Sequence, residues 1–222
     1  MNISSGCKLC TRFVRSGRTP QVLLSSSAAA TTEKLTMEKS EQRRKRRKIL
    51  DQILRVDHAG ELGANYIYKG QLKALGSSSP AAKTIEDMWS HEKEHLATLE
   101  EMMPRERTRP SLLQPLWQCA GYTLGYASGL MGEKVAMACT DAVEEAIVDH
   151  YNEQIRELLE KQEENQDSYE DVAQILSKMR DEEQHHMDVS KENDSESAPL
   201  YSVMKSVIKT GCKVAIFAAE KV

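Results

Sequence analysis

Apolar residues recur along most of this chain at the three- to four-residue spacing of amphipathic helices. No convincing stretch alternates with a period of two, so the pattern predicts an all-α fold. The expected helices span residues 41–75 and 80–103, a third from about 112, a fourth ending near 162, and then 169–192 and 199–221. Their ends are indicated by the Gly- and Ser-rich segment 76–80, by Pro104 and by the acidic segment 163–167.

The third expected helix differs from the others because it carries no charge. The 23 positions between Arg109 and Glu133 lack any charged residue, a length that approaches a membrane span. Polar residues interrupt the segment, so it is only weakly apolar. Its small residues Gly121, Gly125 and Gly129 fall four apart and predict close approach of another helix. We expect this helix to contact a membrane surface or to line a ligand channel.

The last expected helix has two contrasting faces. Its apolar face comprises Val203, Met204, Val207, Ile208, Cys212 and Ala215, and its basic face Lys205, Lys209 and Lys213. This pattern is typical of an interfacial helix, although helices that pack on a protein core also have such faces. We therefore expect two additional, membrane-associated helices in a protein that lies on a bilayer and does not span it.

An internal repeat links the two halves of the chain. Glu61 is followed thirty-one residues later by Glu92-Lys-Glu-His95, and Glu144 thirty-nine residues later by Glu183-Gln-His-His186. The match extends to three further pairs at equal offsets: Tyr68 with Tyr151, Gln71 with Gln154, and Leu75 with Leu158. This pattern predicts a duplication, with repeats of about 50–132 and 133–222, whose helical hairpins pack into a four-helix bundle.

The repeated residues are of the kinds that bind metal ions. Residues three apart lie on one face of a helix, so each Glu-x-x-His pair can point toward a common centre together with the two lone glutamates. Four carboxylates and two imidazoles are the ligand set of a carboxylate-bridged two-metal site in a helical bundle. Such ligands suit iron or manganese. In the second pair, spacing alone permits either Glu182 with His185 or Glu183 with His186.

A rival motif overlaps the first pair. The run His91-Glu92-Lys-Glu-His95 matches H-E-x-x-H, in which both histidines bind zinc and the glutamate is a general base. This interpretation leaves Glu61, Glu144 and the second Glu-x-x-His pair unexplained. We therefore expect Glu92 and His95 to be ligands and His91 to point away from the centre.

Charge distribution separates a leader from the main domain. Residues 1–32 contain four basic residues, no acid and many hydroxyl side chains, which is typical of a mitochondrial transit peptide. We expect a leader over residues 1–36 and one domain over 37–222. Without the four leader charges, 26 basic residues face 34 acidic ones, so nucleic acid is not an expected partner. The basic cluster 43–48 fits a solvated helix start or a contact with anionic lipid.

Three segments resemble the mitochondrial demethoxyubiquinone hydroxylase family. They are Arg55-Val-Asp-His-Ala-Gly-Glu61-Leu-Gly-Ala-Asn65, Ala138-Cys-Thr-Asp-Ala-Val-Glu144-Glu145 and Arg180-Asp-Glu-Glu183, and the similarity extends from about Leu50 to Val222. The resemblance implies a ferritin-like di-iron monooxygenase with two iron ions per chain. Its implied reaction uses O2 to hydroxylate the ring of demethoxyubiquinone or its quinol, at the penultimate step of ubiquinone biosynthesis.

The resemblance also implies site residues and partners. Aligning the Arg-Asp-Glu-Glu run favours Glu183 with His186, so the implied ligands are Glu61, Glu92, His95, Glu144, Glu183 and His186. His150 and Tyr151 follow as residues that support the ligands or simply pack in the bundle. The implied partners are a polyprenyl quinone, the matrix face of the mitochondrial inner membrane and a lipid-binding protein of the biosynthetic complex. The chain has no nucleotide-binding glycine motif that would indicate the electron source, and the resemblance implies electrons derived from NADH.

Two other functions are compatible with such a bundle. One is a ferroxidase or iron-binding protein, and the other is a non-catalytic, membrane-bound scaffold of a quinone biosynthetic complex. The apolar third and sixth helices argue against an iron-storage shell, and six metal-competent residues argue against a degenerate site.

Overall fold

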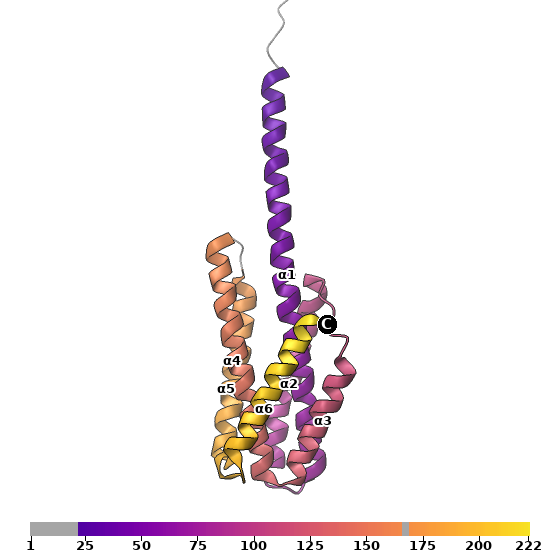
Figure 1. Cartoon of the computed structure of the whole chain (residues 1–222), viewed down its shortest axis with the longest axis vertical. Coiled ribbons are helices and arrows are strands. Elements are labelled where there is room, and N and C mark those ends of the chain that lie inside the picture. The colour runs from indigo at the N-terminus through magenta and orange to yellow at the C-terminus, as the bar shows by residue number, and fades with distance from the viewer. Residues whose placement is uncertain (1–21, 166–168) are drawn as a thin grey trace, which may run out of the picture. The chain divides into compact units, whose positions relative to one another are not determined.

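The computed structural model describes residues 22–165 and 169–222, and within these residues it contains helices and no strand (Figure 1). The elements are α1 (Val22–Leu75), α2 (Ala82–Glu106), α3 (Gln114–Leu130), α4 (Glu133–Asn165), α5 (Glu170–Glu192), the short 3-10 helix η1 (Ser195–Ser197) and α6 (Tyr201–Lys221). The chain divides into a unit Met1–Glu41 and a unit Gln42–Val222, and the second unit contains α2 to α6 and most of α1. The expected all-α fold is confirmed. Residues 1–21 of the expected leader lie outside the described residues.

Two expected helix ends are wrong, and both errors concern prolines and glycines. The first helix begins at Val22 rather than at residue 41, because neither proline nor glycine follows Pro20 until Gly60. Helix α2 continues past Pro104 to Glu106. A proline this close to a helix end forfeits only one backbone hydrogen bond, and the helix stops instead at Arg107, whose φ is 58°.

The four helices α1, α2, α4 and α5 enclose two apolar layers. The larger layer is formed by Leu50, Ile53, Leu54, Leu99, Met102, Met103, Tyr151, Leu158, Tyr169, Val172, Ala173, Leu176 and Met179. The smaller layer includes Tyr68, Ala81, Ile85, Met88 and Met137. On every one of the four helices, the predicted ligands fall between the residues of these two layers. The polar residues of the repeat therefore occupy the middle of an otherwise apolar bundle.

Helix α3 packs against α1 through the three predicted glycines. A Cβ atom added to Gly125 would lie 1.9 Å from the carbonyl oxygen of Ile67, and one added to Gly121 would lie 2.4 Å from that of Gly63. Only glycine permits so close an approach of two backbones. The opposite side of α3 and its flanks expose Leu112, Leu116, Tyr126, Leu130 and Met131.

Helix α6 crosses the bundle and packs on α4 (Figure 1). Lys209 Nζ lies 2.6 Å from Oε1 of Glu145 and 3.3 Å from Oδ2 of Asp149. Lys205 pairs with Glu145 and lies 3.3 Å from Oδ2 of Asp141. Two of the three lysines of the expected basic face therefore pair with acids of α4, a contact that the sequence of α6 alone does not indicate.

The exposed face of α6 mixes apolar residues with polar ones such as Ser206, Thr210 and Lys213. It includes Val203, Val207, Val214 and Phe217, each more than half exposed. Among the described residues, no helix combines the length and hydropathy needed to cross a bilayer.

Candidate metal centre

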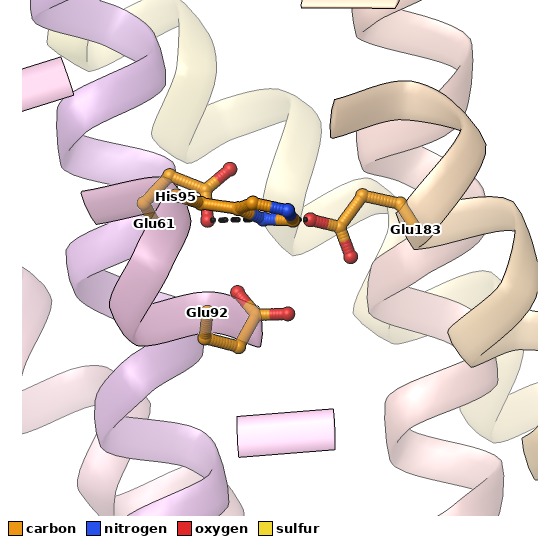
Figure 2. A group of neighbouring side chains, drawn as sticks. All are labelled: Glu61, Glu92, His95 and Glu183. Carbon is orange, nitrogen blue, oxygen red and sulfur yellow. Dashed lines mark ion pairs between the residues drawn. The ribbon is translucent and has the colours of Figure 1, made fainter. Parts of the chain in front are cut away.

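The six predicted ligands converge in the middle of the bundle as two overlapping groups. The first group is Glu61, Glu92, His95 and Glu183, and the second is Glu92, Glu144, Glu183 and His186. Within each group one oxygen or ring nitrogen of every residue lies within 4.8 Å of the others, and all six side chains are buried. Figure 2 shows the first group, with His95 between the carboxylates of Glu61 and Glu183. Glu92 and Glu183 belong to both groups, as bridging carboxylates do.

The donor set fits metal ions because several of its buried atoms lack a hydrogen bond, and Oε2 of Glu92 and Oε2 of Glu144 have no ion pair either with a histidine in the part of the chain that the structure describes. The buried ligand atoms without a hydrogen bond among the described residues are Glu61 Oε2, both carboxylate oxygens of Glu92, His95 Nδ1, Glu144 Oε2 and Glu183 Oε1. Unpaired buried charge is costly, and a cation placed between these atoms would remove that cost. Oxygen donors with two imidazoles and no thiolate suit iron or manganese.

Both histidines turn Nδ1 toward the centre. Nδ1 of His95 lies 2.8 Å from Oε1 of Glu183 and 3.5 Å from Oε2 of Glu61. Nδ1 of His186 lies 2.9 Å from Oε2 of Glu183 and 3.1 Å from Oε1 of Glu92. Each Nδ1 therefore faces carboxylates contributed by more than one helix.

The close packing of carboxylates shifts the pKa values of the residues in the centre. Burial, followed by repulsion from neighbouring carboxylates, raises the pKa of Glu92 and of Glu144 well above the usual range. Burial opposes the charged form of Glu183 too, but hydrogen bonds and attraction from His186 and His95 outweigh it and lower its pKa to about 2. Burial would lower the pKa of His95, yet Glu183 and Glu61 raise it to about 12. Without metal, protons on the histidines thus neutralise part of the carboxylate charge.

Two tyrosines link the halves of the repeat reciprocally. The hydroxyl of Tyr68 on α1 donates to Oε1 of Glu144 on α4, at 2.8 Å. The hydroxyl of Tyr151 on α4 donates to Oε1 of Glu61 on α1, at 2.5 Å. Burial and the adjacent carboxylates raise the pKa of both tyrosines, so both remain donors. Tyr151 was predicted at the site, whereas Tyr68 was noted only as its match in the repeat.

The matched glutamines make a second reciprocal pair of contacts. Gln71 on α1 donates to Thr140 of α4 at 3.1 Å, and Gln154 on α4 donates to Oδ1 of Asp57 on α1 at 2.7 Å. Thr140 and Asp57 each precede a predicted ligand glutamate by four residues, so these contacts also follow the repeat. His150 lies 2.9 Å from Gln154 and 3.6 Å from Asp57, and neither of these residues is a predicted ligand.

The second Glu-x-x-His pair lies in the register that the resemblance favoured. Glu183 and His186 are fully buried in the centre, whereas His185 is exposed. Glu182 is partly exposed and binds the outer nitrogen of His95. His91, which was expected to point away from the centre, lies beside the outer ring nitrogen of a predicted ligand, with its Nδ1 3.0 Å from Nε2 of His186. His91 is nevertheless in neither group of candidate ligands.

A buried amide holds α1 and α2 together beside the centre. Nδ2 of Asn65 donates to the backbone carbonyls of Glu61 and Glu92 at 3.0 and 2.9 Å, and its Oδ1 accepts from Nε1 of Trp89. This network fixes the relative height of the two helices that carry the first group.

A helical bundle with duplicated hairpins and a buried carboxylate–histidine centre defines the class of ferritin-like proteins able to hold a dinuclear metal site. The family model described as "Ubiquinone biosynthesis protein COQ7" matches residues 48–219. The chain belongs to this family. It is a hydroxylase of ubiquinone biosynthesis, and neither the ferroxidase nor the scaffold alternative is favoured.

Curated relatives agree with this assignment. The chain is 50% identical over 175 residues, 79% of each chain, to the Bos taurus protein named NADPH-dependent 3-demethoxyubiquinone 3-hydroxylase, mitochondrial. It is 41% identical over 174 residues to the 3-demethoxyubiquinol 3-hydroxylase of Rhodospirillum rubrum, covering 78% of this chain and 79% of the relative. It is also 40% identical over 182 residues, 78% of each chain, to the 5-demethoxyubiquinone hydroxylase, mitochondrial, of Saccharomyces cerevisiae.

Proposed function

We propose that the chain is a di-iron monooxygenase that uses O2 to hydroxylate the ring of demethoxyubiquinone or its quinol. The observation that supports this most directly is the pair of overlapping ligand groups that share Glu92 and Glu183. In this proposal Glu61 and His95 complete one iron position, and Glu144 and His186 complete the other. The names of the relatives supply the substrate class, since they specify hydroxylation of demethoxyubiquinone or demethoxyubiquinol.

Two ferrous ions, when bound, supply the electrons for reductive activation of oxygen. The protein's own contribution is to orient the ligands and keep water out. Tyr68 donates a hydrogen bond to one oxygen of Glu144, and Tyr151 donates one to an oxygen of Glu61. The second oxygen of each glutamate has no hydrogen bond among the described residues and is left for the centre. The apolar layers on either side of the centre exclude bulk water from the reacting groups.

The names of the relatives indicate the class of reductant. Several mitochondrial relatives are named NADPH-dependent, whereas the family resemblance alone suggested electrons from NADH. We propose a reduced nicotinamide nucleotide as the electron source, and direct comparison of the two nucleotides in one assay distinguishes them.

The substrate suggests where the protein works. A polyprenyl quinone resides in lipid, and we propose that the exposed apolar faces of α3 and α6 rest on the matrix side of the mitochondrial inner membrane. The side chains that support this are Leu112, Leu116, Leu130 and Met131 beside or on α3, and Val203, Val207, Val214 and Phe217 on α6. These helices pack on α1 and α4, which carry Glu61 and Glu144, so an entrance between them would be short. The same apolar surface is the proposed contact for a lipid-binding partner protein.

Iron analysis followed by a turnover assay tests the proposed reaction. The purified chain is loaded anaerobically with ferrous iron and then supplied with a short-tailed demethoxyquinone, O2 and NADPH or NADH. We expect about two irons per chain, as ligand sets of this type hold, and a hydroxylated ring detected by mass spectrometry. Two irons without ring hydroxylation would contradict the monooxygenase and leave a ferroxidase or a scaffold.

Flotation with phospholipid vesicles tests the proposed membrane surface. We expect the variants V207S and F217S to reduce the vesicle-bound fraction, because each removes exposed apolar surface from α6. The variant T210S is a matched control, since Thr210 is exposed on the same helix and already polar. Equal binding by all three variants and the unaltered chain would exclude this face of α6 as the contact.

A further inference from the structure

The residue immediately before each Glu-x-x-His pair reaches into the other half of the repeat. His91 precedes Glu92 on α2, and Glu182 precedes Glu183 on α5, so the two residues occupy equivalent positions. Glu182 contacts His95 of the first half, and His91 contacts His186 of the second half. The contacts are reciprocal in the same way as those of the tyrosines, but here the two residues differ in chemistry.

The outer nitrogen of His95 binds a carboxylate. Its Nε2 lies 2.7 Å from Oε2 of Glu182, while Nδ1 faces the centre. Glu182 is about one-third exposed, and its other oxygen lies 3.5 Å from Nζ of Lys178. When a metal ion replaces the proton on Nδ1, Nε2 would keep its hydrogen and donate it to Glu182, and the lone pair of Nδ1 would be available to the metal. A carboxylate acceptor both fixes this tautomer and makes the imidazole a stronger donor to a metal.

The outer nitrogen of His186 binds an imidazole instead. Its Nε2 lies 3.0 Å from Nδ1 of His91, and the two rings are nearly parallel, with an interplanar angle of 7° and centroids 5.3 Å apart. A neutral imidazole also fixes the tautomer of His186, because its Nδ1 accepts the hydrogen of Nε2. It carries no negative charge, so it increases the basicity of its partner less than a carboxylate does.

We infer that Glu182 and His91 are positioning residues that make the two metal positions unequal, with the position of Glu61 and His95 binding its metal more tightly. The inference rests on the proposed metal centre and adds a property to it. The other elements of the centre are balanced across the repeat: each position has one terminal glutamate, one tyrosine donor and the same two shared carboxylates. The two positions differ in the residue that binds the outer nitrogen of each histidine, which is the carboxylate of Glu182 for His95 and the imidazole of His91 for His186.

The size of the difference follows from the general effect of such partners. Residues that bind the outer nitrogen of a ligating histidine typically change metal affinity by about 10- to 100-fold. We therefore expect the first ferrous ion to occupy the position of Glu61 and His95 with roughly 10-fold or greater preference over the other position.

The experiment is an anaerobic titration of the full chain with ferrous iron, in which the two stepwise dissociation constants are measured. In parallel, Mössbauer spectra are recorded after loading about one and two equivalents of 57Fe, the proposed complement of such a site. At one equivalent the unaltered chain should give mainly a single quadrupole doublet, and a second, distinct doublet should appear with the second equivalent.

Three variants assign the difference to the two outer residues. E182Q keeps the size of the side chain but removes its charge, so the tighter constant should weaken by about 10-fold and approach the other. E182D restores a carboxylate and should recover part of the difference. H91E supplies a carboxylate to His186, so the weaker constant should tighten. D181N is the matched control, because Asp181 is exposed beside Glu182 and pairs with Arg180.

The outcomes separate the inference from the proposed function. A chain that binds no iron would contradict the metal centre itself. A chain that binds two irons with equal constants, or whose constants are the same in E182Q and D181N, would overturn the inequality and leave the centre intact. A gain in affinity in H91E supports the inference specifically, because mere loss of structure cannot produce it. Thermal unfolding of the metal-free variants establishes that each is folded.

Discussion

Glu144 and Glu145 are neighbours on α4, yet they face two regions with opposite electrostatics. Glu144 is 1% exposed, receives one hydrogen bond from Tyr68 and keeps its second oxygen unpaired. Glu145 faces α6 and pairs with Lys205 and Lys209. Burial raises the pKa of Glu144. Burial also opposes the charged form of Glu145, but hydrogen bonds and attraction from Lys205 and Lys209 together outweigh it and lower the pKa of Glu145.

The two glutamates belong to two different regions, the buried centre proposed to bind metal and the contact that attaches α6 to α4. In the centre, carboxylates are held together without enough cations, which destabilises the metal-free protein and favours metal uptake. At the α4–α6 contact, each lysine is matched by acids, and partial exposure keeps the cost of pairing small. In the proposed centre, charge on one face of α4 would serve metal binding, whereas charge on its other face attaches α6.

The largest difference between the two regions is expected when Glu144 and Glu145 are neutralised one at a time. We expect E144Q to lower iron affinity and ring hydroxylation by more than about 100-fold, because it removes a ligand outright. The metal-free variant should nevertheless be about as stable to urea as the unaltered chain, because the raised pKa of Glu144 already favours its neutral form and an amide oxygen can still accept the hydrogen bond from Tyr68. E145Q, the adjacent control, should keep its iron and its activity. Similar losses in both variants would show that α4 does not separate the two regions.

Helix α3 is attached to α1 by close backbone contact, unlike α6, which is attached to α4 by ion pairs. In G125A the new methyl group would meet the carbonyl oxygen of Ile67, so we expect a loss of about 1–3 kcal/mol in the free energy of unfolding. G211A is the control, because Gly211 is exposed on α6 and a Cβ there meets nothing within 4 Å. Urea unfolding at low and high salt should give the same loss for G125A. A strong dependence on salt would contradict attachment by backbone contact.

The pH dependence of iron binding should report the protons held in the centre. The pKa values of Glu92, Glu144, His95 and His186 are raised, so these groups tend to hold protons in the metal-free state. Ligands must be deprotonated, so binding should release protons and the apparent affinity should rise with pH. Calorimetry in two buffers of different ionisation enthalpy measures this release. Affinity that falls as pH rises from 6 to 8, the range near neutrality in which histidines usually titrate, would contradict the assignment.

The smallest effect is expected at the α4–α6 contact. K209M should lower the free energy of unfolding by about 0.2–1 kcal/mol, and added salt should reduce the difference. Because the pKa of Glu145 is lowered in the folded state, its contribution is present above its unfolded pKa and is lost as the pH falls through the folded value. Urea unfolding at two salt concentrations checks K209M, and K213M is the control because Lys213 is exposed. Equal losses in both variants would argue against a specific role for the ion pair.

The sequence predicted the bundle and the meeting of the six ligand side chains well, because both depend on helical periodicity. Residues three apart share a face of a helix, so spacing placed Glu92 with His95 and allowed Glu183 with His186, and the two-fold repeat predicted that these faces meet. The glycine stripe likewise predicted close helix contact correctly, although the sequence did not identify α1 as the partner. That the six carboxylate and imidazole side chains bind iron remains a proposal.

The remaining features depend on contacts between helices, which periodicity within one helix does not determine. The partners of Lys205 and Lys209 lie on α4, about sixty residues earlier. The sequence left His91 out of the ligand set, but it did not indicate that the ring contacts His186 on another helix. The equal offsets of Tyr68 and Tyr151 were visible in the sequence, and only the packing of α1 on α4 shows that each serves the other half.

The crossed tyrosine bonds have a consequence for how such a molecule could have arisen. Neither hairpin contains the hydroxyl donor for its own lone glutamate, so an isolated hairpin lacks part of the arrangement. Two identical hairpins related by a two-fold axis would supply each other's donor at once. An ancestral homodimer of one short gene product is therefore chemically self-sufficient, and fusion of its two copies would have freed each to diverge.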